Sequence, residues 1–192
     1  MRYEESVIEG RNAVIEAFRS GKTIDKLFIL DGCKDGPVST VVREAKKHDT
    51  IINYVKRERL DEMSVTGKHQ GVIAYVAAYE YVTVDDIIKI ARDKNEDPFI
   101  FILDNIEDPH NLGAIIRTAN LAGAHGVIIP KRRAVGLTST VARTSAGAIN
   151  YTPVAKVTNI SNTIEELKKE GMWFACADVD GDVMYNCNLT GP

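Results

Sequence analysis

Cysteine is scarce in this sequence, and its few positions exclude two kinds of site. The 192 residues include three cysteines, Cys33, Cys176 and Cys187, an odd number spread widely along the chain. A disulfide framework needs an even set of cysteines, and a structural metal site needs closely spaced pairs. The pattern therefore predicts three reduced thiols in a cytosolic protein and no metal site.

Long apolar runs are also lacking. The first ten residues carry acidic side chains where a signal peptide has its apolar stretch. No run approaches the roughly 20 apolar residues that a membrane helix needs. We therefore expect a cytoplasmic protein.

Basic residues are not in excess either. The formal net charge is −3 at pH 7, whereas nucleic-acid-binding domains are usually basic. Any surface for RNA must therefore be a local patch. The sequence also contains no Gly-x-Gly-x-x-Gly pattern, which excludes a dinucleotide site of the Rossmann type.

What the sequence does contain is an alternation of helical and strand patterns, which is typical of an α/β fold. Apolar residues at helical spacing predict helices over 10–21 and 36–49 in the first part of the chain. Short apolar runs predict strands at 26–30, 51–55 and 69–78. This unit ends near residue 79.

The second part of the chain alternates more regularly and predicts an open parallel sheet. Its fully apolar runs suit strands that are covered on both faces. The predicted strands lie at 99–103, 126–130, 154–157 and 172–179. A short helix capped by Thr83 is predicted, with Ile87, Ile88 and Ala91 on its apolar side. Further helices are predicted at 111–123, 138–147 (helix or turn) and 161–171, the last capped by Ser161 or Asn162.

The loop after the strand at 99–103 is the strongest candidate for a site, because ligands of open parallel sheets bind at the carboxyl ends of the strands. It reads "DNIEDPHNLGAIIRTA" from residue 104. One interpretation is a plain turn in which Asn111 caps the following helix. The other is a phosphate site: Gly113 allows close approach to the backbone, and Arg117, one turn later, offers a planar fork of donors.

This stretch resembles the first signature motif of the SpoU-type RNA 2′-O-ribose methyltransferases, a branch of the SPOUT superfamily. The matching residues are Asn111, Gly113, Arg117, Thr118 and Ala119. The resemblance implies that Arg117 is the central catalytic residue, with Asn111 near the same site. Whether Arg117 clamps a phosphate or acts as the general base stays open, and His110 is interpreted as a turn residue.

Three further stretches extend the resemblance over nearly the whole chain. "TSAGAINYTPV" (144–154) is similar to the family's next motif, with Asn150 where many members have Glu. "IEGRNAVIEAF" and "KHQGVIAYV" resemble the L30e-like substrate-binding domain of the ribosomal RNA members. The fold class implied is α/β, with an L30e-like substrate-binding domain at 1–79, a linker at 80–97 and a SPOUT-type (α/β knot) parallel-sheet catalytic domain at 98–192.

The resemblance also implies a reaction, a cofactor and a partner. It predicts methylation of a guanosine ribose 2′-hydroxyl in 23S ribosomal RNA, with S-adenosyl-L-methionine as methyl donor and a homodimer as the active form. The segments that tie the family's knot and form most of its cofactor pocket are not found, so the cofactor-binding residues are expected beyond Pro192. Two alternatives remain: a non-catalytic RNA-binding fragment, and 2′-O-methylation of transfer RNA.

The remaining candidate residues are assigned to RNA or to the lining of the site. The residues expected to contact ribosomal RNA are Arg11, Lys68, His69, Gln70, Lys131, Arg132, Arg133 and Arg143. The residues expected to line the active site are Gly113, Ser145 and Gly147.

Overall fold

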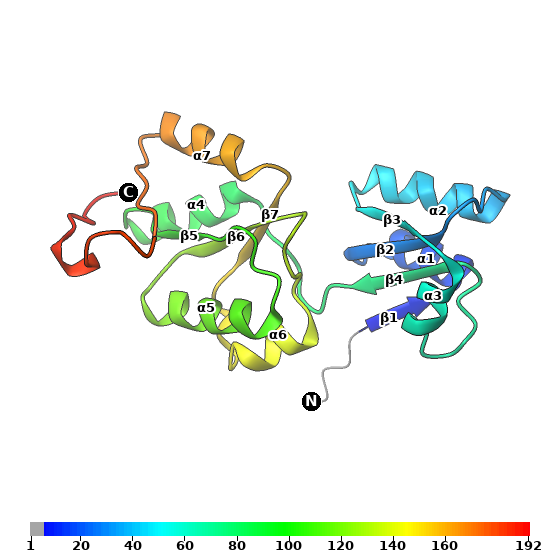
Figure 1. The fold of residues 1–192 in the computed structure, drawn as a ribbon. Coiled ribbons are helices and arrows are strands. Elements are labelled where there is room, and N and C mark those ends of the chain that lie inside the picture. The colour runs from blue at the N-terminus through cyan, green and yellow to red at the C-terminus, as the bar shows by residue number, and fades with distance from the viewer. Residues whose placement is uncertain (1–5) are drawn as a thin grey trace. The chain divides into compact units, whose positions relative to one another are not determined.

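The computed structural model describes residues 6–192 and divides the chain into two compact units (Figure 1). The first contains the chain up to Glu80 together with Asp108–Gly113 and Val135–Thr144. The second contains Tyr81–Glu107, Ala114–Ala134 and Ser145–Pro192. The α/β class predicted from the alternating patterns is confirmed in both units.

A mixed four-stranded sheet forms the centre of the first unit, in the order β1-β4-β2-β3. Strands β2 and β3 are parallel, and β4 is antiparallel to both β1 and β2. The strands are β1 (Ser6–Glu9), β2 (Ile24–Leu30), β3 (Ile52–Val55) and β4 (Val72–Val76). The last three confirm predicted strands, whereas β1 was not predicted.

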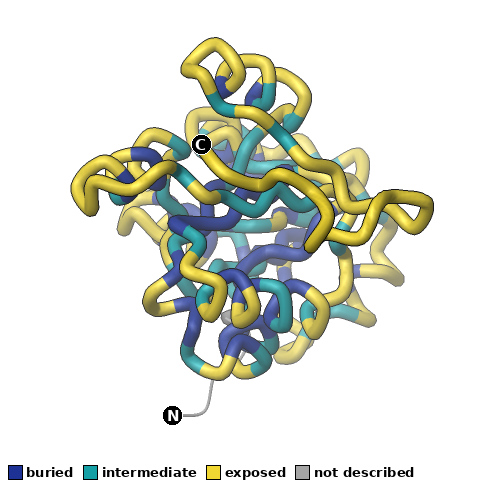
Figure 2. The backbone as a smooth tube through the Cα atoms, turned by 90° about the vertical axis from the view of Figure 1, so that its left-hand side faces the viewer, coloured by how far each residue is buried: buried dark blue, intermediate teal, exposed yellow. Residues whose placement is uncertain are grey.

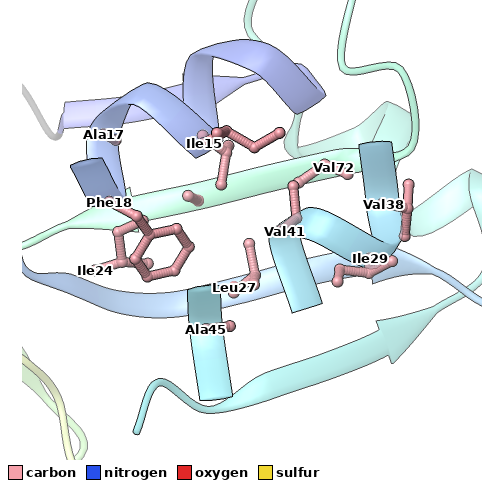
Figure 3. Close-up of a cluster of buried hydrophobic side chains, with 12 residues drawn as sticks. Ile15, Ala17, Phe18, Ile24, Leu27, Ile29, Val38, Val41, Ala45 and Val72 are labelled. Atoms are coloured by element: carbon pink, nitrogen blue, oxygen red, sulfur yellow. The ribbon is translucent and has the colours of Figure 1, made fainter. Parts of the chain in front are cut away.

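Two helices bury the core of the first unit against this sheet (Figure 3). Side chains of α1 (Arg11–Arg19) and α2 (Gly36–Lys47) pack on Leu27 and Ile29, which are fully buried. Each such side chain stabilises the fold by about 1.5–3 kcal/mol relative to an exposed one. A third helix, α3 (Arg57–Met63), contributes buried Leu60.

The second unit contains the predicted parallel sheet, in the order β5-β6-β7. The strands are β5 (Ile100–Ile102), β6 (Gly126–Pro130) and β7 (Val154–Val157). All five residues of the central strand β6 are buried, which explains its continuous apolar sequence. Along the chain these strands are followed by α5 (Pro109–Leu121), α6 (Ser139–Thr144) and α7 (Ile160–Lys169). Helix α6 and the first residues of α5 belong to the first unit.

Helix α4 (Val84–Lys94) lies within the stretch predicted as a linker and is folded with the second unit. Its Ile87 and Ile88 share a buried cluster with Ile128 of β6 and Ala155 of β7. The predicted cap is confirmed: the side-chain oxygen of Thr83 accepts from Asp86 N, and the Asp86 carboxylate accepts from Thr83 N at 2.9 Å. This reciprocal capping box satisfies two donors at the start of the helix.

The predicted caps of α5 and α7 are wrong. Helix α5 begins at Pro109, and the carboxylate of Asp108 accepts from His110 N at 2.7 Å, so Asn111 lies inside the first turn. Proline suits a first turn because its fixed φ is helical and its missing N–H has no partner to lose. In α7 the cap is Asn159, whose Oδ1 accepts from the backbone at position 162.

The predicted strand at 172–179 is also wrong. Residues 172–178 have no regular structure, and the exposed tube continues to the C-terminus in Figure 2. Met172 and Phe174 pack against the buried cluster of α4 and β6, so their alternating burial imitates a strand without a hydrogen-bonded ladder. The place beside β7 is taken by Val82, which bridges to Ala155.

Candidate functional site

Helix α5 presents Arg117 on its exposed side. Leu112, Ile116 and Ala119 are fully buried on the opposite side, as the helical spacing predicted. The Arg117 side chain forms no hydrogen bond or ion pair with any residue that the structure describes. An exposed guanidinium without an internal partner keeps all of its donors available for a phosphate.

Asn111 does not join Arg117 on this face. The two residues are six positions apart in one helix, which places them about 9 Å apart along the axis and about 120° apart around it. Both are exposed. Gly113, by contrast, lies one turn before Arg117 and is buried. Arg117 and Asn111 are therefore not immediate neighbours on the helix.

The loop after β6 carries a second exposed basic group. Lys131 is held at the end of the sheet because its backbone N–H donates to Val157 O at 2.8 Å. Arg132 and Arg133 follow it and are exposed, and neither side chain has a partner among residues 6–192. Because β5, β6 and β7 are parallel, this loop lies at the same edge as the loop that leads into α5.

The block 144–150 begins at the end of α6 and is largely internal. Arg143 is exposed, but Ser145 is fully buried, so the prediction that Ser145 lines an accessible site is not supported by its position. The following residues Ala146 and Gly147 have φ of +51° and +89°. Glycine adopts this left-handed region without strain, which explains its presence in the turn.

Two first-unit residues predicted to contact RNA are used inside the protein. His69 is only 5% exposed; its Nδ1 accepts from Gly71 N at 3.0 Å, and its Nε2 lies 2.9 Å from Asp61 Oδ1. Arg11 is ion-paired with Asp35 at 2.6 Å and donates from Nε to Gln70 O at 2.9 Å. These bonds give both side chains a structural role, so His69 is corrected to a buried anchor.

Lys68 and Gln70 remain available in this unit. Both side chains are exposed on the loop 64–71, and that of Lys68 has no partner among the described residues. In the sequence "KHQG", Lys68 and Gln70 are therefore exposed, whereas His69 between them is buried.

Glu9 was missed by the sequence analysis and organises this loop. Its carboxylate accepts hydrogen bonds from Ser64 Oγ, Thr66 Oγ1, Val65 N and Thr66 N. Burial raises the pKa of Glu9, but the bonds from the Thr66 and Ser64 side chains and from the Val65 and Thr66 backbone outweigh burial and lower the pKa from 4.5 to about 2. The only sequence signal was an acidic residue directly before Gly10.

Among residues 6–192, one buried side-chain polar atom, Thr152 Oγ1, has no hydrogen-bond partner. No three His, Cys, Asp or Glu side chains of this part of the chain gather as metal ligands, and none of its helices has the length and apolarity to cross a bilayer.

Two family models match the chain. Residues 98–192 match the SpoU rRNA Methylase family, and residues 7–82 match the family described as RNA 2′-O ribose methyltransferase substrate binding. A relative from Bacillus subtilis named as a TrmH family tRNA/rRNA methyltransferase is 52% identical over 93% of this chain and 71% of its own length. A relative of the same name from Staphylococcus haemolyticus is 46% identical over 95% of this chain and 73% of its own.

Solved structures with a similar arrangement are more distant. An RNA methyltransferase of the TrmH family from Porphyromonas gingivalis has a TM-score of 0.46 at 20% identity, covering 96% of this chain and 66% of that one. An S-adenosylmethionine-bound rRNA methyltransferase from Sinorhizobium meliloti has a TM-score of 0.39 at 24% identity, covering 84% of this chain. The chain spans 57% of the length of that Sinorhizobium structure.

Proposed function

Because this chain belongs to the SpoU/TrmH family of tRNA/rRNA methyltransferases, as its motifs predicted, we propose that the protein methylates a ribose 2′-hydroxyl of RNA. The methyl donor in this proposal is S-adenosylmethionine, and the active form is a cytoplasmic homodimer. The match of residues 7–82 to a substrate-binding model for 2′-O ribose methyltransferases supports the ribose as the acceptor.

The proposed substrate is a guanosine of 23S ribosomal RNA. The L30e-like resemblance of the first unit favours ribosomal RNA over transfer RNA, whereas the names of the relatives cover both. Transfer RNA is therefore the competing substrate, and a direct comparison of the two RNAs as methyl acceptors distinguishes them.

The observation that carries the proposal is the exposed, unpartnered Arg117 on the helix that follows β5. A guanidinium stays protonated at neutral pH and binds phosphate through two parallel hydrogen bonds. In this role Arg117 holds the phosphate next to the reacting ribose and fixes the direction of its 2′-hydroxyl. Positioning of this kind supplies much of the rate enhancement in a transfer between two bound groups.

A non-catalytic RNA-binding role is the second candidate. It rests on the match of residues 7–82 to a substrate-binding family model. In that case Arg117 and the loop after β6 bind RNA without methyl transfer.

The test compares Arg117→Lys and Arg117→Ala with the parent protein. Transfer of labelled methyl groups to 23S fragments and to transfer RNA is measured alongside RNA affinity and S-adenosylmethionine binding by calorimetry. Arg43→Lys, at an exposed position of α2, is the matched control.

We expect Arg117→Lys to lower methyl transfer at least about 10-fold, because lysine keeps the charge and loses the planar fork, while RNA affinity changes little. A normal rate in Arg117→Lys contradicts the bidentate role. A parent protein that binds RNA but transfers no methyl group favours the non-catalytic candidate.

A further inference from the structure

We propose that the loop 64–71 of the first unit is a preorganised clip for the RNA phosphate backbone, and that Glu9 is the positioning residue that holds it. The inference rests on the proposed function, because it takes RNA as the ligand of this unit. It adds a role for a carboxylate that does not itself contact the RNA.

The first part of the loop, residues 64–66, is fixed by Glu9. One carboxylate oxygen accepts from Val65 N at 2.5 Å and Thr66 N at 3.2 Å, and the other accepts from Ser64 Oγ at 2.7 Å and Thr66 Oγ1 at 2.5 Å. The same two hydroxyls also fix the backbone that follows. Ser64 Oγ accepts from Gly67 N at 2.9 Å, and Thr66 Oγ1 accepts from Lys68 N at 3.2 Å. Bonds to a charged acceptor are stronger than neutral ones.

The last part of the loop, residues 70–71, is fixed by Arg11 and His69. Arg11 Nε donates to Gln70 O at 2.9 Å, and His69 Nδ1 accepts from Gly71 N at 3.0 Å. Gly10, between Glu9 and Arg11, donates its N–H to Val72 O at 3.0 Å. The chain segment 9–11 therefore secures both ends of a loop that lies about sixty positions later in the sequence.

This network does little for the hydrophobic core, which points to a role at the surface. Val65 is 80% exposed, and the next three residues of the loop are exposed as well. Such a loop buries too little apolar surface to be ordered by packing. The hydrogen-bond network keeps the loop in one conformation. Binding a ligand therefore does not carry the entropy cost of ordering the loop.

The exposed chemistry of the loop matches a phosphate-containing ligand. Lys68 offers an unpartnered ammonium group, and the exposed amide of Gln70 offers both a donor and an acceptor. Lysine binds phosphate as a point charge, and the amide can reach a ribose hydroxyl or a base edge. Lys68 forms no ion pair with a carboxylate among the described residues.

The experiment is a double-mutant cycle on this protein, with RNA affinity measured at several salt concentrations. We expect Lys68→Ala to lower the slope of log affinity against log salt by about 1, as for the loss of one phosphate contact. Glu9→Gln should lower this slope by a similar amount, since the amide nitrogen cannot accept the loop's donors. Adding Lys68→Ala to Glu9→Gln should then change little, because both changes remove the same contact.

Glu16→Gln is the matched control, since Glu16 is an exposed glutamate of α1 that pairs only with Arg19 of the same helix. If Glu9→Gln fails to fold, Ser64→Ala with Thr66→Val removes two of the four donors and leaves the carboxylate in place. A parent protein that binds no RNA refutes the proposed function. The positioning role of Glu9 alone is overturned if Lys68→Ala weakens RNA binding while Glu9→Gln keeps the parent slope of log affinity against log salt. It is also overturned if the effects of the two changes add.

Discussion

Gly126 at the start of β6 is the position where one added methyl group should disturb the second unit most clearly. A Cβ at this position would lie 2.6 Å from Ile87 Cδ1, 2.7 Å from Cγ1 and 2.8 Å from Cγ2. Carbon atoms in contact normally lie about 3.5–4.0 Å apart. Ile87 is fully buried between α4 and the sheet, so its side chain has no free space to move into. The backbone of Gly126 itself accepts alanine, since its φ is not in the left-handed region.

The expected loss of stability follows from two opposing effects. Overpacking of a filled core costs about 1–3 kcal/mol, and replacing glycine by alanine in a strand regains roughly 0.5–1 kcal/mol. Gly126→Ala should therefore lower the free energy of unfolding by about 1–2 kcal/mol. Urea unfolding followed by the fluorescence of Trp173, the single tryptophan of the chain and part of the second unit, measures the change.

The same clash predicts a specific non-additivity. Ile87→Ala removes all three clashing atoms and should by itself cost about 2–5 kcal/mol. In the Gly126→Ala background the same change should cost less, because it also relieves the overlap. If the two losses simply add, the steric explanation is refuted.

Two further predictions concern carboxylates with a lowered pKa. Glu9 stabilises the folded state fully above its ordinary pKa of 4.5, and this contribution is lost as the pH falls towards its folded pKa of about 2; we expect it to be worth about 1–2 kcal/mol after allowance for solvent screening. Glu9→Gln should therefore flatten the acid limb of the stability curve between pH 5 and 2, and an unchanged limb contradicts this. Thr83→Ala removes the main cause of the lowered pKa of Asp86, the hydrogen bond from the Thr83 side chain. The pKa of Asp86 should therefore rise in an NMR titration, and loss of the helix cap should cost about 1 kcal/mol of stability. An unchanged pKa of Asp86 contradicts the cap.

The strands and helices that the sequence predicted correctly are those whose pattern is set by burial along their whole length. The parallel strands β6 and β7 and the helices α2 and α4 belong to this group. Strand β1 escaped prediction because its four residues, "SVIE", carry too short a pattern. It forms through pairing with β4, which lies far away in the sequence.

The errors at 111 and 172–179 arise because tertiary contacts overrode what the local sequence favours. Asn111 is a good cap in isolation, but Asp108 precedes a proline that already begins the helix. The stretch 172–179 has the alternation of a strand, yet Met172 and Phe174 gain their burial from the cluster of α4 and β6. Strand formation needs a ladder partner, and a sequence pattern does not show whether one is present.

The sequence did not show which candidate site residues are exposed and which are held by partners within the protein. Family motifs identified Arg117 and Lys68, which the structure leaves exposed and unpartnered among the described residues. The same motifs could not separate His69, a buried residue with both ring nitrogens engaged, from its exposed neighbours. Glu9 was invisible for the same reason, since its partners are at positions 64–66.

The anchors also explain how a chain of net charge −3 can offer a surface to RNA. Glu9 is surrounded by loop donors, Asp35 pairs with Arg11, and Asp61 faces His69. Each of these carboxylates has a hydrogen-bond or ion-pair partner within the first unit. Lys68 in the first unit and Arg117 in the second unit are exposed and have no internal partner in the described part of the chain. A ligand responds to the local potential at the surface it meets, and here that potential is set by which charges are paired internally and not by their total.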